Sequence, residues 1–231
     1  MNEGGPSWKD SIKKGPDQHR TIGRTLGLDP ERIPGRSLEQ YEYELQFDRR
    51  ELEGKTVLDL GSGLQALLDK SLKKAGIHAT VISLSPDYSN EEHRKFLEPT
   101  RWEKFKAVIK DERAEPLAVA GVGEQLPFKD ESFDEVLALA SVSAYSERYQ
   151  EFLSEICRVL KNGGIARIGA LYDDTDRKYG QVPRSIQYSE FIEKLGYEYE
   201  LVPIPITTSG KVISGRGGEK SFRIRKVESK V

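Results

Sequence analysis

The stretch that decides the fold is Val57–Lys70, which reads VLDLGSGLQALLDK. Apolar residues around Asp59 run directly into Gly61-Ser62-Gly63, and a leucine pattern typical of a helix follows. A buried strand, a glycine turn and a helix in this order are typical of a nucleotide-binding βαβ unit, whose ligand lies on the turn. The glycines fit G-x-G-x-x-A, one form of the dinucleotide fingerprint, and they equally fit a second kind of nucleotide site. The turn alone therefore leaves a dinucleotide, another nucleotide or no ligand open.

Asp59 distinguishes between these ligands. In an open parallel sheet the ligand binds beyond the carboxyl ends of the strands, and Asp59 stands near such an end, two residues before the first glycine. A carboxylate there repels the pyrophosphate of NAD and favours a ligand that carries an ammonium or sulfonium group. S-adenosylmethionine (SAM) carries both, together with a carboxylate that suits the free N–H groups at the start of the following helix. Asp59 therefore favours SAM over NAD; the alternative is that it is only a cap or turn acid.

Composition and charge limit the possible classes of protein. The chain has 231 residues, enough for one domain with a sizeable core, and a formal net charge of −2, so we expect no nucleic-acid partner. The single cysteine, Cys157, excludes an intrachain disulfide and a cysteine-rich zinc site, and the expected location is cytoplasmic. The start of the sequence, MNEGGPSWKDSIKK, lacks the apolar segment of a secretory signal, and no apolar run approaches the roughly 20 residues of a membrane span.

Apolar periodicity predicts strands that alternate with helices from residue 37 onward. The predicted strands are Thr56–Leu60, His78–Leu84, Pro116–Val122, Phe133–Ser141, Gly164–Leu171, Tyr197–Ile206 and Ser221–Val227. The first predicted helix starts after Ser37, which pairs with Gln40 in a capping box, and the second runs from Leu64 to Gly76. A third is expected around Trp102, Phe105 and Ile109. The fourth spans Tyr149–Leu160 and is stopped by Asn162-Gly163-Gly164, and the fifth is capped by Ser189 and ends at Gly196.

This alternation predicts an α/β fold in which right-handed βαβ units form a parallel sheet with helices on both faces. The last two strands are the exception. They are joined by the loop TTSGKVISGRGGEK, which is short for a crossover connection, so we expect them to pair antiparallel.

Four stretches carry a resemblance to a known family. They are KTVLDLGSG (55–63), VISLSPDYS (81–89), GEQLPFKDESFDEVLAL (123–139) and FLSEICRVLKNGG (152–164). In order and spacing they resemble the class I SAM-dependent methyltransferases, in particular the family called type 11, over about residues 54–172. The resemblance implies a Rossmann-like three-layer sandwich, with a seven-stranded, mostly parallel sheet whose last strand is antiparallel. It also implies SAM as the cofactor and methyl transfer as the activity.

The family's cofactor contacts fall at definite positions of this sequence. The resemblance implies that Asp59, Gly61 and Gly63 hold the methionine part of SAM, that Gly123 meets the adenine ring, and that Ala140 and Ser141 lie near the sulfonium. The complete set of cofactor-binding positions implied in this way is Asp59, Gly61, Ser62, Gly63, Ser83, Leu84, Gly123, Glu124, Ala140 and Ser141. For Glu124, capping the following loop is an equal alternative.

Three positions depart from the family pattern. The acid that binds the ribose hydroxyls is replaced by Ser83, the acid that accepts the adenine amine by Val122, and the third glycine of the turn by Gln65. A hydrogen bond to a charged group contributes roughly 1.5–3 kcal/mol, so two missing acids weaken SAM binding unless other groups compensate. Ser83 can still bond one hydroxyl, Asp87 can reach the ribose from the next turn, and a backbone carbonyl can take the adenine amine.

The catalytic residues are not defined by the sequence. A base is needed only where the methyl acceptor must lose a proton, and the weak candidates are Tyr145, Glu147 and Tyr172, which follow the fourth and fifth strands. The run DDTD after Tyr172 lacks the glycine and glutamate of a calcium loop, so we expect no metal site.

We therefore expect an N-terminal extension over residues 1–53, serving as a lid or substrate-recognition segment, and a SAM-dependent methyltransferase domain over residues 54–231. The predicted function is methyl transfer to a small-molecule acceptor. Because Ser83, Val122 and Gln65 depart from the family, the alternative is a catalytically degenerate, methyltransferase-like binding or regulatory protein.

Overall fold

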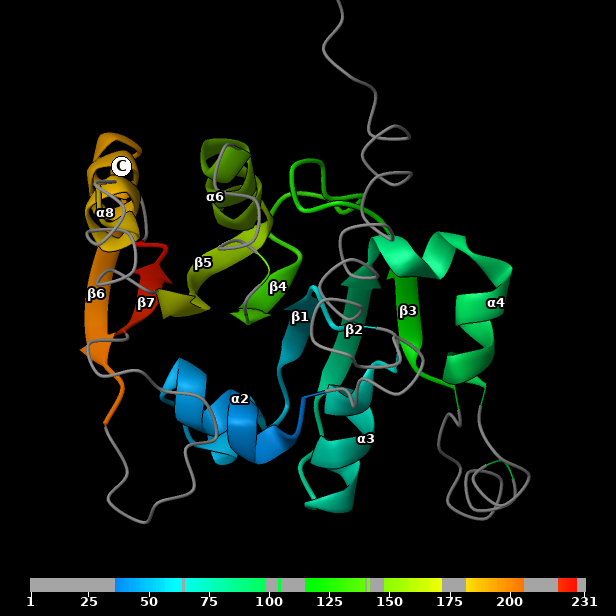
Figure 1. Ribbon diagram of the computed structural model, residues 1–231. Coiled ribbons are helices and arrows are strands. Elements are labelled where there is room, and N and C mark those ends of the chain that lie inside the picture. The colour runs from blue at the N-terminus through cyan, green and yellow to red at the C-terminus, as the bar shows by residue number, and fades with distance from the viewer. Residues whose placement is uncertain are drawn as a thin grey trace, which may run out of the picture.

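A seven-stranded sheet forms the centre of the molecule (Figure 1). The computed structural model describes residues 36–63, 65–98, 104, 115–139, 141, 148–171, 182–205 and 220–227. The strand order is β3-β2-β1-β4-β5-β7-β6. The strands are β1 (Thr56–Leu60), β2 (Thr80–Ser85), β3 (Leu117–Ala120), β4 (Phe133–Leu139), β5 (Leu160–Leu171), β6 (Glu198–Pro203) and β7 (Lys220–Arg225).

The direction of the strands confirms the predicted fold. The five strands from β3 to β5 are parallel to their neighbours, whereas β7 is antiparallel to both β5 and β6. The chain reverses direction along the sheet after β3, because β4 pairs with the other side of β1. The carboxyl ends of β1 and β4 at such a reversal are where parallel sheets bind ligands.

Helices cover both faces of the sheet (Figure 1). The α-helices are α2 (Leu38–Leu45), α3 (Leu67–Lys74), α4 (Glu91–Arg94), α6 (Tyr149–Val159) and α8 (Arg184–Lys194), and the 3₁₀ turns are η2 (Arg49–Leu52), η3 (Pro86–Ser89) and η4 (Lys95–Leu97). Alternation along β1 divides the core, since Val57 packs with α2 and α3 while Leu58 and Leu60 pack with α6 and α8. No helix of the described residues is long and apolar enough to span a membrane.

The strand predictions differ from the structure mainly at their ends. Thr56–Leu60 is confirmed, whereas β2 begins two residues later than His78 and β3 is shorter than Pro116–Val122 at both ends. The helix predicted from Leu64 begins at Leu67, after Ala66 in the left-handed region at φ 46°. The predicted helix around Trp102, Phe105 and Ile109 lies outside the described residues.

Two predicted helix boundaries are wrong. Helix α6 ends at Val159, just before the predicted last residue Leu160, because Leu160 has extended backbone angles and pairs with Phe133 at the start of β5. Helix α8 is not capped by Ser189, because its N-cap is Pro183. Ser189 lies inside the helix, where its hydroxyl donates to the carbonyl of Ser185 at 2.7 Å. Such a bond to the preceding turn satisfies a serine in mid-helix and gives it the sequence appearance of a cap.

Helix α2 begins as predicted and packs into the core. The hydroxyl of Ser37 accepts the backbone N–H of Gln40 at 3.2 Å, while the side-chain amide of Gln40 donates to Glu44 and does not complete the predicted capping box. Leu38 and Leu45 of this helix belong to the same core cluster as the strand residues beneath it. The described part of the predicted N-terminal extension thus packs on the sheet, and the boundary after residue 53 stays a prediction.

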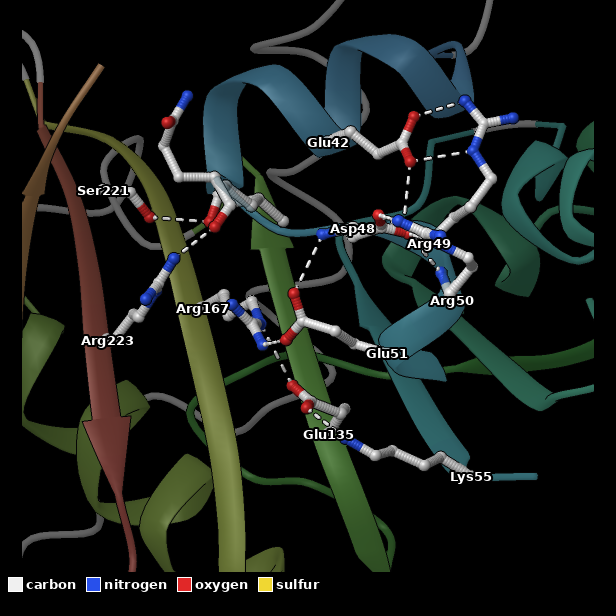
Figure 2. Close-up of polar contacts among 12 residues, drawn as sticks. Glu42, Asp48, Arg49, Arg50, Glu51, Lys55, Glu135, Arg167, Ser221 and Arg223 are labelled. Carbon is white, nitrogen blue, oxygen red and sulfur yellow. Dashed lines mark hydrogen bonds and ion pairs between the residues drawn. The ribbon is translucent and has the colours of Figure 1, made fainter. Parts of the chain in front are cut away.

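A partly buried ionic network fixes the segment after α2 to the sheet (Figure 2). Arg167 of β5, 2% exposed, donates to Glu51 of η2 at 2.6 Å and to Glu135 of β4 at 3.3 Å. Lys55 completes the network with a bond of 2.8 Å to Glu135, which is fully buried. Because removing one partner would leave a buried charge uncompensated, this network ties η2 to β4 and β5.

The C-terminal end of α2 is held by strand β7. The hydroxyl of Ser221 donates to the carbonyl of Leu45 at 3.3 Å, and the guanidinium of Arg223 donates to the carbonyl of Gln46 (Figure 2). These carbonyls belong to the last turn of the helix, which has no partners for them within the helix itself. Contacts from β4, β5 and β7 therefore set the position of α2 against the sheet.

Candidate cofactor site

The turn after β1 requires glycine at two positions. Gly61 and Gly63 have φ values of 78° and 71°, in the left-handed region that side chains disfavour. A Cβ atom on Gly61 would lie 2.5 Å from Cβ of Ser141, which follows β4, so the two strand ends meet without room for a side chain. A Cβ atom on Gly63 would meet open space. The glycine pattern in the sequence thus reflects a close contact at Gly61 and a left-handed backbone at both positions.

Other elements hold this turn in place. The carbonyl of Leu84 at the end of β2 accepts the backbone N–H groups of Gly61 and Ser62 at 2.9 and 3.3 Å. The hydroxyl of Tyr88 in η3 donates to the carbonyl of Gly63 at 2.7 Å and lies 2.7 Å from the hydroxyl of Ser62. Leu84 itself points into the core, so its structural contribution to the site comes from its backbone.

The carboxylate of Asp59 is buried, and only one of its two oxygens accepts a hydrogen bond from the described residues. It is 1% exposed, and its Oδ1 accepts the hydroxyl of Tyr41 from helix α2 at 2.7 Å. Its Oδ2 has no hydrogen-bond partner in the described part of the chain. Burial raises the pKa of Asp59 to about 6, against the opposing effects of Tyr41, the Arg36 guanidinium and Ser83. A buried acceptor without a donor costs roughly 1–3 kcal/mol, which a cationic ligand would relieve.

The neutral residue at the end of β2 lies beside this carboxylate. Ser83 is the register partner of Asp59 across the β1–β2 pair, is 1% exposed, and its hydroxyl has no partner among the described residues. Asp87 follows in η3, where the hydroxyl of Ser85 donates to its Oδ2 at 3.2 Å and Nδ1 of His93 lies 3.7 Å from its Oδ1. An acid therefore lies one turn beyond the position where the family pattern has one.

The turn after β3 is closed by packing. Val122 is buried and forms an isolated bridge with Gln125. A side chain on Gly123 would overlap the ring of Phe152 in α6, so only glycine fits there. The carboxylate of Glu124 lies 3.3 Å from the guanidinium of Arg148, just ahead of α6. Glu124 thus has a partner within the protein.

The structure places some of the predicted residues and not others. Ser141 is buried and its hydroxyl has no partner among the described residues. Outside the described residues lie Ala140 and the catalytic candidates Tyr145, Glu147 and Tyr172. The described residues also contain no group of three or more side chains suited to a metal ion.

Sequence reasoning placed Tyr41 and Arg36 only in the N-terminal segment and gave Tyr88 no role, whereas all three contact the glycine turn or its acid. Arg36 donates to the carbonyl of Gly61 at 3.0 Å. The periodicity of the segment from Leu38 to Leu45 does place Tyr41 on the buried face of a helix. The partner of its hydroxyl depends on how that helix crosses β1, which periodicity does not specify.

Three unpartnered groups suggest the kind of ligand that fits. Asp59 Oδ2, Ser83 Oγ and Ser141 Oγ come from the carboxyl-terminal parts of β1 and β2 and from the residues after β4. A carboxylate oxygen suits an ammonium group, the hydroxyls suit hydroxyl or amine groups, and the glycine turn admits a ligand close to the backbone. SAM has these groups, so the residues present at this end of the sheet fit its methionine part and one ribose hydroxyl.

The comparisons with known proteins agree with this geometry. Residues 58–168 match a family model described as a methyltransferase domain. No curated protein matches the sequence.

Solved structures match the fold over most of the chain. The N-methyltransferase NodS of Bradyrhizobium japonicum, in complex with S-adenosylhomocysteine, is 15% identical at a TM-score of 0.57, covering 90% of this chain and 97% of that one. The 1,6-didemethyltoxoflavin-N1-methyltransferase of Burkholderia thailandensis is 13% identical at a TM-score of 0.55. The match covers 99% of this chain and 94% of that one. A Haloferax volcanii protein in complex with the Trm112 methyltransferase activator is 15% identical at a TM-score of 0.54. The match covers 96% of this chain and 99% of that one.

At these identities the solved structures establish the fold, and the family model adds the domain that the fold carries. The glycine turn after β1 lies inside the matched residues, as do Asp59 and Ser83. Residues 58–168 of this chain therefore match the model of a methyltransferase domain, and the described residues have the fold of the solved methyltransferases.

Proposed function

We propose that the protein transfers a methyl group from SAM to a small-molecule acceptor, and that Asp59 and the turn Gly61–Gly63 hold the methionine part of the cofactor. The observation that carries the proposal is the buried Asp59 carboxylate, whose Oδ2 lacks a partner within the described residues. A buried acceptor of this kind, beside a turn that excludes side chains at Gly61, is suited to the ammonium of SAM.

The remaining contacts follow the strand ends. Ser83 would donate to or accept from one ribose hydroxyl, Gly123 and Glu124 would border the adenine, and Ala140 and Ser141 would lie near the sulfonium. SAM supplies an already activated methyl group when it is bound. The contribution of the protein is then to bind the methionine end, exclude water and align the acceptor with the methyl group.

The acceptor is proposed to be a small molecule. The Burkholderia thailandensis protein with a similar fold holds 1,6-didemethyltoxoflavin together with S-adenosylhomocysteine. A small heteroaromatic amine is therefore a reasonable first class of acceptor to screen. Where an acceptor must lose a proton, Tyr145, Glu147 and Tyr172 are the candidate bases, since each follows a strand that ends near the cofactor.

Binding and transfer are tested separately. Isothermal titration with S-adenosylhomocysteine and with NAD distinguishes the two ligands that the glycine turn allows, and we expect only the first to bind. Transfer is then measured with methyl-labelled SAM and an extract divided into small-molecule and macromolecular fractions. Label in the small-molecule fraction supports the proposal. Binding of NAD without S-adenosylhomocysteine, or label in macromolecules alone, would contradict it.

A second candidate is a methyltransferase-like binding or regulatory protein without catalysis. It is favoured by Ser83 and Val122, which replace two acidic contacts to the nucleoside. A wild type that binds S-adenosylhomocysteine but labels nothing would favour this candidate. Because the Haloferax volcanii relative in fold is bound to a methyltransferase activator, the labelling is repeated in whole lysate, where any activating partner is present.

A further inference from the structure

The contact between Tyr41 and Asp59 links the predicted N-terminal extension to the cofactor site. The two side chains are 2% and 1% exposed, and the hydroxyl of Tyr41 lies 2.7 Å from Oδ1 of Asp59. Burial and the charge of Asp59 both raise the pKa of Tyr41 well above its usual value. The phenol therefore keeps its proton and acts as a donor throughout the range in which a carboxyl group titrates.

A donor that is always present favours the ionised form of its acceptor. We propose that Tyr41 is a positioning residue of the cofactor site, whose hydroxyl keeps Asp59 in the ionised form that binds the ammonium of the ligand. This inference rests on the proposed function, because it assumes that Asp59 binds the methionine end of SAM. It assigns to the N-terminal segment a role inside the site, in addition to any role as a lid.

Among the groups around Asp59, Tyr41 contributes most to keeping the carboxylate ionised. Arg36, just before α2, lowers the pKa of Asp59 but donates a hydrogen bond to the carbonyl of Gly61. Ser83 on β2 lies near enough to lower that pKa slightly, although its hydroxyl makes no hydrogen bond of ordinary geometry with the described residues. Tyr88 in η3 is occupied with Ser62 and the carbonyl of Gly63.

The remaining neighbours of this carboxylate are apolar or paired. On β4, the register partner of Asp59 is Leu137, which belongs to the buried core. Helix α3 contributes Leu68 and Leu72 to the same core, and its Asp69 is paired with Lys73 at 3.0 Å. Tyr41 is therefore the described residue whose side chain donates a hydrogen bond of ordinary length, 2.7 Å, to the Asp59 carboxylate.

The position of the Tyr41 hydroxyl is set by the sheet. Helix α2 is held at its end by Ser221 and Arg223 of β7, and the segment that follows it is tied to the sheet by Arg167 (Figure 2). Leu38 and Leu45 on the same face of the helix are buried. Tyr41 is therefore presented to Asp59 by a helix fixed at several points, which is what a positioning residue requires.

The experiment measures the affinity for S-adenosylhomocysteine from pH 5 to pH 8.5 by isothermal titration, for the wild type, Tyr41→Phe and Tyr43→Phe. Tyr43 is the matched control, because it lies on the same helix and its hydroxyl donates to the carbonyl of Pro205, beyond β6 at the far edge of the sheet. In the wild type we expect the affinity to fall below a midpoint at about pH 6, the pKa of Asp59.

In Tyr41→Phe we expect that midpoint to move up by about one pH unit, because a hydrogen bond to the charged form is lost. The variant then binds about fivefold more weakly than the wild type at pH 6 and within about twofold of it at pH 8.5, where Asp59 is ionised in both. Tyr43→Phe keeps the wild-type profile. An equal loss of affinity at every pH, an unmoved midpoint, or the same shift in Tyr43→Phe would overturn the proposal.

Two further variants separate the effect of the Tyr41 hydroxyl on the charge of Asp59 from an effect on packing. In an Asp59→Asn background, adding Tyr41→Phe should change neither the affinity nor its dependence on pH, since no charge remains to be tuned. Replacing Tyr41 by 3-fluorotyrosine keeps the packing and makes the hydroxyl a stronger donor, so the midpoint should move down; an upward move would contradict the role. A wild type that binds no S-adenosylhomocysteine at any pH overturns the proposed function itself, whereas normal binding without the shift overturns only the role of Tyr41.

Discussion

The two ends of the proposed cofactor site are built differently. At the methionine end, the turn Gly61–Gly63 and the carboxylate of Asp59 are supported by Arg36, Tyr41 and Tyr88 from separate parts of the chain. At the nucleoside end, strand β2 presents a neutral serine and the turn after β3 presents a buried valine, where the family pattern has acids. If SAM binds as proposed, it is held by charge at one end and mainly by backbone and hydroxyl groups at the other.

This asymmetry has an energetic consequence. A hydrogen bond to a charged group contributes roughly twice as much as a neutral one, so the methionine end should dominate the affinity. Substitutions there should have large effects, and substitutions at the nucleoside end should have small ones.

The largest effect is expected for Gly61→Ala. The new Cβ would lie 2.5 Å from Cβ of Ser141 and would have to be accommodated at a φ of 78°, so the turn or the end of β4 must move. Because a displacement of about 1 Å can cost roughly a hundredfold, we expect losses of that size in methyl transfer and in affinity for S-adenosylhomocysteine. Titration calorimetry and the labelled-methyl assay measure both.

The control for this variant is Gly54→Ala. Gly54 has a φ of 72°, but a Cβ atom there would meet nothing within 4 Å. Both variants pay for a left-handed side chain, roughly 1 kcal/mol, and only Gly61→Ala meets a neighbour. Equal losses of affinity in the two variants would show that general destabilisation, and not the closeness of the strand ends, explains the result.

The next largest effect is expected for Asp59→Asn, with opposite signs for binding and for stability. Binding of S-adenosylhomocysteine should weaken by roughly 30-fold, since a charge-assisted bond to the ammonium is replaced by a neutral one. The free energy of unfolding without ligand should rise at pH 7.5, because an ionised carboxylate is no longer buried with an unpaired oxygen.

The dependence of stability on pH follows from the raised pKa of Asp59. Its folded value of about 6 lies above its ordinary value of 3.8, so the folded state binds this proton more tightly than the unfolded state does. The contribution of Asp59 to stability is therefore fully present below about pH 4 and is lost as the pH rises through 6, by an amount on the order of 3 kcal/mol. Urea unfolding at pH 5 and pH 7.5 should show the advantage of Asp59→Asn growing with pH; a constant difference would contradict this.

The sequence predicts the methionine end better than the elements that support it. The strand Thr56–Leu60, the acid and the glycines lie within eight consecutive residues, so local pattern and local chemistry coincide. The reversed final hairpin is equally predictable, because the length of one loop determines it. Contacts between Tyr41 and Asp59, or between Arg167 and Glu51, depend on how distant segments pack, and no spacing in the sequence specifies them.

The errors in the sequence analysis have local physical causes. Ser189 is read as a cap because serine favours that position, yet it bonds within its own helix. The end of α6 is placed too late because the glycines at 163 and 164 are the strongest stop signal, whereas pairing of Leu160 with Phe133 ends the helix earlier. In both cases a tertiary or side-chain interaction replaces the expected local signal.

At the nucleoside end, Val122→Asp should tighten binding. Val122 stands where the family pattern has an acid that accepts the adenine amine, and a carboxylate there would restore a charged acceptor. We expect S-adenosylhomocysteine to bind about tenfold more tightly, which corresponds to roughly 1.4 kcal/mol. Val122→Asn, which adds an acceptor without charge, should give a smaller gain. Unchanged affinity in both variants, measured by calorimetry, would mean that the adenine amine is bound elsewhere.

The smallest effect is expected for Ser83→Ala, and it should again have opposite signs for binding and stability. The buried hydroxyl of Ser83 has no partner among the described residues, so its removal should raise the free energy of unfolding of the ligand-free protein by roughly 1 kcal/mol. If the hydroxyl bonds one ribose hydroxyl, the same change should weaken binding of S-adenosylhomocysteine about fivefold.

Analogues that lack the 2′- or the 3′-hydroxyl then identify the partner, because the variant and the wild type should bind the correct analogue equally. Ser89→Ala, an exposed serine on the adjoining turn η3, is the control and should change neither quantity. A Ser83→Ala variant that is less stable and binds as tightly as the wild type would instead show that this hydroxyl serves the protein, and that Asp87 or the backbone alone holds the ribose.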